Sequence, residues 1–180
     1  MSQKYILGRR AQTRYHALRY TLASGCLLVL LSVLQVSFFA RFRVFGAAPD
    51  LMIVAVLGIA YFSGPYAGAI NGIAAGFLIE AIGSSGITLL PLCYLLCGYL
   101  VGYYARSNPK TYPTYLIYLG VTLLYRAVIT VLYASLTYRD LRLPPVLLYS
   151  VLPELLLTAI AGLVIFFPMR LFCGWLARKR

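Results

Sequence analysis

The sequence predicts an all-α polytopic membrane protein with about six transmembrane helices, forming a single transmembrane domain over residues 1–180. Of these residues, 62% are hydrophobic and only 11% are charged, which is not the composition of a water-soluble domain. The apolar residues also gather into runs close to the roughly 20 residues that a helix needs to cross a hydrocarbon core about 30 Å thick. The expected runs are 19–40, 44–63, 64–82, 87–105, 113–137 and 145–167.

We expect a bundle over residues 19–168 with a basic tail on each side, 1–18 and 169–180. The first run is expected to stay in the protein as a span, because it is full length and no small-x-small processing site follows it. Basic residues near span ends are retained in the cytoplasm. With the N-terminus inside, eleven of the sixteen basic residues are cytoplasmic, and the outer segments hold only Arg41, Arg43, Arg139 and Arg142. Both termini are therefore predicted to be cytoplasmic.

The net charge of +12 predicts attraction to anionic lipids at the membrane surface. Nucleic-acid binding is not expected, because leucines and tyrosines interrupt the basic tails.

Residues for catalysis are scarce in this sequence. The only histidine is His16 in the basic tail, and the only acids are Asp50, Glu80, Asp140 and Glu154. No phosphate-binding glycine loop and no paired metal-ligand spacing occurs. Cys93 and Cys97 share a helix face, but no histidine or acid lies near them in sequence, so we interpret them as apolar filler. We expect neither an enzyme nor a bound cofactor or metal.

The stretch GPYAGAINGIAAGFLIE places glycine at every fourth position, at Gly64, Gly68, Gly72 and Gly76. Residues four apart follow a slanting line along a helix, so these glycines are expected to form a groove that admits a neighbouring backbone. Small residues of this kind promote close helix packing in lipid. Two helices could occupy this groove: another span of the same chain, or the membrane helix of a partner.

Two acids are expected near the outer ends of their spans. Glu80 continues the glycine register, and Asp50 follows Pro49 near the outer end of the second run. Together they predict an acidic outer rim, which Arg41 or Arg43 would neutralise. The other interpretation makes Glu80 a hydrated carboxylate at the interface, because an ionisable group is costly deeper in the hydrocarbon.

Arg126 lies near the middle of the fifth run and needs a partner. If the sixth helix begins at Pro145, Glu154 reaches a similar depth, and we predict an intramembrane ion pair between Arg126 and Glu154. The competing interpretation begins this helix at Pro153, with Glu154 near the helix N-terminus and the outer surface. Arg126 would then have a different partner.

Several of these elements together resemble the rod-shape-determining protein MreD family of bacterial inner membranes. They are Pro49-Asp50-Leu51, Gly64-Pro65, and Gly76-Phe77-Leu78 closing on Glu80, followed by a turn with Gly86. The resemblance extends over most of the chain, with motif-like detail in residues 48–103. The family commonly has aspartate where this chain has Glu80.

The resemblance implies a non-enzymatic scaffold of the cell-shape and peptidoglycan elongation complex. Its implied partner is an MreC-type single-span protein, within a complex that includes the MreB filament, RodA and a class B penicillin-binding protein. On this basis the glycine groove would receive the partner's helix.

The MreD family is also similar in fold to the substrate-binding S components of energy-coupling-factor transporters, which gives an alternative function. A vitamin-binding subunit would hold its ligand near Asp50 and Glu80, but the short outer segments contain few of the polar groups that such a ligand needs. A third possibility is a small proton-coupled carrier that uses Glu80 or Glu154 as a relay.

Overall fold

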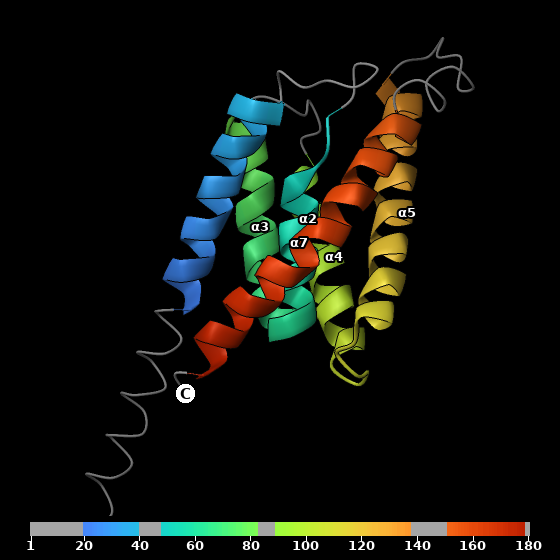
Figure 1. Ribbon diagram of the computed structural model, residues 1–180. Coiled ribbons are helices and arrows are strands. Elements are labelled where there is room, and N and C mark those ends of the chain that lie inside the picture. Colours follow the sequence, from blue (N-terminus) through green and yellow to red (C-terminus); the bar gives the residue numbers. More distant parts are fainter. Residues whose placement is uncertain (1–19, 40–47, 83–88, 138–150, 179–180) are drawn as a thin grey trace, which may run out of the picture.

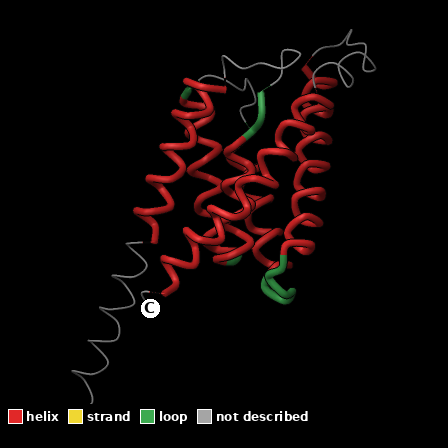
Figure 2. Tube along the Cα trace, viewed as in Figure 1, coloured by secondary structure: helices red, strands yellow, loops and turns green. Residues whose placement is uncertain are grey.

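The computed structural model describes residues 20–39, 48–82, 89–137 and 151–178, and these ranges are helical with short connections and no strand (Figure 2). A first helix covers residues 20–34 and ends in the π-helical turn η1 (Gln35–Phe39). It is followed by α2 (Leu51–Ser63), α3 (Pro65–Ala81), α4 (Leu90–Ala105), α5 (Tyr112–Thr137) and α7 (Leu152–Arg178). Successive helices run in opposite directions (Figure 1). The predicted all-α class is confirmed for the described residues.

The centre of the bundle is α2. Every residue from Leu51 to Tyr61 is buried, and the hydrophobic residues among them are at most 3% exposed. The helices α3, α4 and α7 pack around it, and α5 contacts it at the edge (Figure 1). Because the whole circumference of α2 is covered by other helices, its sequence carries no polar face.

Among the described residues, three helices are long and apolar enough to cross a membrane: the segment Tyr20–Ser37, Tyr112–Leu132 in α5 and Leu152–Trp175 in α7. These agree with the predicted membrane class. The other helices are shorter, and the 13 residues of α2 extend only about 20 Å at 1.5 Å per residue. The prediction of six complete spans therefore remains a prediction.

The last helix differs from its expected range of 145–167. It begins at Leu152 and continues through Pro168 to Arg178, so most of the expected tail 169–180 is helical. Proline removes one backbone N–H from the helix, but membrane helices tolerate this because neighbouring groups satisfy the freed carbonyl.

The turn between α2 and α3 depends on Gly64. Its φ of 96° ends α2 and starts α3, a conformation that side-chain-bearing residues rarely adopt. Pro65 then occupies the first turn of α3, where its missing N–H costs nothing. This tight turn places α3 directly beside α2.

Candidate functional site: a buried charge cluster and a glycine-packed helix pair

Arg126 of α5 lies between two carboxylates inside the bundle. Its Nε is 3.3 Å from Oδ2 of Asp50, and its Nη2 donates a long hydrogen bond of 3.4 Å to Oε1 of Glu154. The contact with Asp50 is an ion pair without hydrogen-bond geometry. The side chains of Arg126 and Asp50 are only 15% and 6% exposed. One guanidinium therefore faces two acids from two other helices.

Asp50 has further partners at each of its oxygens. Oδ1 accepts from the backbone N–H groups of Met52 and Ile53, both at 3.2 Å, and so caps the N-terminus of α2. Oδ2 accepts a short hydrogen bond from the hydroxyl of Tyr94 in α4. The Asp50 carboxylate thus connects the start of α2 to α4 and α5, and it is part of the framework of the bundle.

Thr158 extends the cluster along α7. Its Oγ1 accepts from the backbone N–H of Asp50 at 3.0 Å and donates to the carbonyl of Glu154 at 2.7 Å. Thr158 is 2% exposed. The side chains of Asp50, Tyr94, Arg126, Glu154 and Thr158, which we call the charge cluster, thus join α2, α4, α5 and α7.

The structure brings the predicted pair Arg126 and Glu154 together, although α7 begins at Leu152 as the competing interpretation required. Glu154 stands in the first turn of α7 and still reaches Arg126, because Arg126 has a long side chain. A helix start near Pro153 and an ion pair between Arg126 and Glu154 were treated as mutually exclusive in the sequence analysis. This was incorrect, because the structure has both.

The expected acidic rim is corrected by the burial of Asp50. Asp50 is 5% exposed and pairs with Arg126, so it does not form part of an exposed rim. Glu80 lies in the last turn of α3, half-buried, with its Oε1 buried and lacking a hydrogen bond to the described residues. Arg41 and Arg43, the expected neutralising residues, lie outside the described residues.

The glycine groove is filled by α4 of the same chain. A Cβ built on Gly68 would lie 2.4 Å from the carbonyl oxygen of Gly98, one on Gly72 would lie 2.4 Å from that of Tyr94, and one on Gly76 would lie 2.3 Å from Cα of Pro91. These backbones are already in contact, so no partner helix can enter between them. The hypothesis that this groove receives a partner is corrected in favour of internal packing.

Gly64 also differs from expectation, since it forms the α2–α3 turn and does not belong to the helix. It still contributes to the seam, because a Cβ on Gly102 of α4 would lie 2.6 Å from the carbonyl carbon of Gly64. Gly98 and Gly102 form a second small-residue series that the sequence analysis missed. Their spacing of four residues was the signal that could have found them.

Tyr94 and Thr158 were missed as well. Tyr94 has no sequence signature, because it lies among apolar residues and its partner is 44 positions away. The capping role of Asp50 did have a signature, since an aspartate directly before an apolar run is typical of a helix N-terminus.

Chemically, the charge cluster holds two carboxylates and one guanidinium, which forms an ion pair with each of them. The described residues contain no group of three or more histidine, cysteine or acidic side chains that could hold a metal ion. Cys97 is buried beside Thr122, with 3.7 Å between Sγ and Oγ1. The arrangement is suited to holding helices in place.

Comparison with models of protein families, with curated proteins and with solved structures finds no match to this chain.

Proposed function

We propose that this chain is a non-enzymatic membrane scaffold of the bacterial cell-shape and peptidoglycan elongation complex. In this role it resides in the inner membrane with both termini in the cytoplasm and holds the membrane helix of an MreC-type single-span partner. The MreB filament, RodA and a class B penicillin-binding protein would belong to the wider complex. The resemblance at Pro49-Asp50-Leu51, in the glycine-rich stretch and at Glu80 supports this assignment.

The observation that carries the proposal is the set of contacts that Asp50 makes inside the bundle. This acid of the Pro-Asp-Leu element contacts Arg126 and Tyr94 and caps α2. A transport subunit would need polar groups that converge on an open cavity, whereas these groups converge on one another. The cluster therefore favours a rigid frame whose outer surfaces bind other proteins.

The partner helix must then bind outside the α3–α4 seam, on a helix face that is exposed in the isolated chain. Val121 on α5 and Phe77 on α3 are each 58% exposed and lie on two different faces of this kind. A photoreactive amino acid at each position would identify the face by crosslinking. Val54 in α2 is 0% exposed and serves as the control, at which only crosslinks within the chain are expected.

The decisive experiment is gentle extraction of the chain from its native membrane, followed by mass spectrometry of the proteins that remain bound. Recovery of a single-span coiled-coil protein that also crosslinks at Val121 or Phe77 is the expected result. Recovery of two ATPases and a larger membrane subunit would overturn the proposal in favour of a vitamin-binding subunit.

A further inference from the structure

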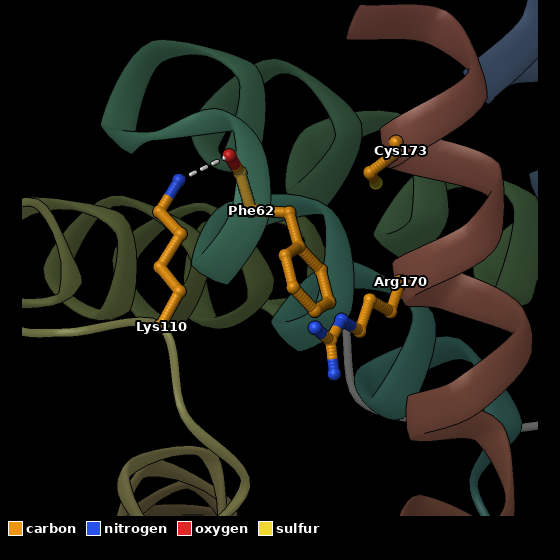
Figure 3. A pocket seen from close by; sticks show the side chains of 5 residues that line it. Phe62, Lys110, Arg170 and Cys173 are labelled. Atoms are coloured by element: carbon orange, nitrogen blue, oxygen red, sulfur yellow. Dashed lines mark hydrogen bonds between the residues drawn. The ribbon is translucent and has the colours of Figure 1, made fainter. Parts of the chain in front are cut away.

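A pocket of about 340 Å³ opens beside the end of α2, whereas the charge cluster lies where α2 begins. It is lined by Phe62 at the end of α2, Lys110 in the α4–α5 connection, and Arg170, Cys173 and Gly174 in the last turns of α7 (Figure 3). The volume is at the lower end of the range for small-molecule sites, about 300–1,000 Å³. The positive-inside pattern assigns this end of the bundle to the cytoplasmic face of the membrane.

Two cations of the pocket lack acidic partners among the described residues. Lys110 Nζ donates to the backbone carbonyl of Phe62 at 2.5 Å, which holds the ammonium at the pocket, and an ammonium has three donors in all. Arg170 is exposed, and no ion pair involves it in the described ranges. Of the described acids, Asp50 and Glu154 are engaged by Arg126, and Glu80 lies at the far end of α3. The pocket thus offers donors for an external anion.

Apolar surface adjoins the cations on the membrane side of α7. Phe167 is one helical turn before Arg170 and is 62% exposed, and Leu171 is 74% exposed. The ring of Phe166 packs against Phe62 in a tilted arrangement and against Tyr112 edge to face, with centroid distances of 5.8 Å and 4.9 Å, and stiffens the pocket wall. A ligand with an anionic head and apolar chains matches this combination better than a soluble anion does.

We propose that this pocket binds the phosphate headgroup of an anionic phospholipid, with Lys110 and Arg170 contacting the phosphate and the acyl chains lying along Phe167 and Leu171. Basic pockets between membrane helices on the cytoplasmic side are suited to such headgroups. The inference is independent of the proposed scaffold function, because it uses none of the residues that carry that proposal.

The test is native mass spectrometry of the full chain in detergent, titrated with phosphatidylglycerol and, separately, with phosphatidylethanolamine. We expect a saturable site for phosphatidylglycerol that Arg170→Gln weakens about fivefold, the factor that corresponds to one basic residue at an anionic surface. The matched control is Arg106→Gln, which removes the same charge from an exposed residue outside the pocket lining. Equal weakening by both variants, or equal retention of both lipids, would overturn the site.

A second variant tests the cavity without changing charge. A Cβ on Gly174 would meet no atom within 4 Å, so Gly174→Phe can fill the pocket while the helix remains intact. A Cβ on Gly120 of α5 would also meet no atom within 4 Å, and Gly120 is not part of the pocket lining, so Gly120→Phe is the control. Loss of phosphatidylglycerol only with Gly174→Phe is expected. Displacement of the lipid by millimolar glycerol phosphate would show a site for soluble anions and overturn the assignment to a lipid.

Discussion

Asp50 and Arg126 show how a charge can be retained inside an apolar bundle. A buried carboxylate is costly unless hydrogen bonds and an opposite charge replace its water. Asp50 obtains two backbone N–H groups, one tyrosine hydroxyl and one guanidinium. Arg126 in turn has Asp50 and Glu154 as its two counter-charges. Removing Arg126 therefore leaves two buried carboxylates without their cation.

Arg126→Met is expected to lower the free energy of unfolding by about 3–5 kcal/mol, because it leaves two acids without their cation. The measurement is reversible unfolding in mixed detergent micelles. Arg106→Met is the matched control, since Arg106 is exposed at the end of α4. An equal, small effect of both variants would show that the cluster contributes nothing to stability.

Exchanging the pair, Arg126→Glu with Glu154→Arg, is expected to restore little of the stability that each single change removes. The new glutamate at position 126 would face Asp50, whose Oδ2 is 3.3 Å from Arg126 Nε in the native protein. Adding Asp50→Asn to the exchanged pair removes this repulsion and keeps an acceptor for the N-cap. The thermal midpoint in detergent should rise with that third change, and a full rescue by the exchange alone would contradict the role of Asp50.

At the scale of helices, α3 and α4 form the tightest pair in the molecule. Gly68 and Gly98 face each other so closely that a Cβ on either would overlap the other's carbonyl group. Such contact is possible only where both helices present small residues, and in lipid it supplies much of the attraction between helices. The pair packs against α2 and forms one wall of the core.

Gly72→Ala is expected to destabilise the isolated chain by about 1–3 kcal/mol, because overpacking forces the two backbones apart. The new Cβ would lie 2.4 Å from the backbone carbonyl oxygen of Tyr94. The side chain of the same tyrosine belongs to the charge cluster. Gly120→Ala places its Cβ in open space and should stabilise α5 by up to about 1 kcal/mol. In unfolding measurements, the free energy of unfolding should therefore fall for Gly72→Ala and rise for Gly120→Ala. A neutral Gly72→Ala would mean that α4 does not occupy the groove.

At the scale of the molecule, the helices alternate in direction around a fully buried α2 (Figure 1). The charge cluster lies toward the end where α2 and α7 begin, and the pocket lined by Phe62, Lys110 and Arg170 lies at the opposite end. The two polar features therefore differ: the charge cluster connects helices within the bundle, and the basic pocket is open at its surface.

The predicted orientation can be checked by cysteine labelling in a variant whose four cysteines are replaced by alanine. Ser107→Cys in the α4–α5 connection should resist a membrane-impermeant maleimide in intact cells and react after lysis, because this end is expected to be cytoplasmic. Leu143→Cys, in the segment predicted to be outside, should react in intact cells. The reverse pattern would contradict the orientation derived from the basic residues.

The sequence by itself determined that this protein is helical and belongs to the membrane class. Apolar runs, sparse charge and basic ends are properties of the local chain, so the helices and the membrane class follow without knowledge of the contacts between helices. The pairing of Arg126 with Glu154 was also predictable, since an isolated intramembrane cation requires an acid and the chain offers very few.

Only the tertiary structure decided which surfaces face one another. The glycine stretch has the same sequence whether α4 or a partner helix fills its groove, and the approach of Gly98 and Tyr94 settled the occupant. The sequence likewise predicts Asp50 at an outer rim, whereas in the structure it contacts Tyr94 of α4, Arg126 of α5 and Thr158 of α7. The physical reason is that helix periodicity fixes which residues share a face, whereas burial and charge pairing depend on contacts between residues far apart in the chain.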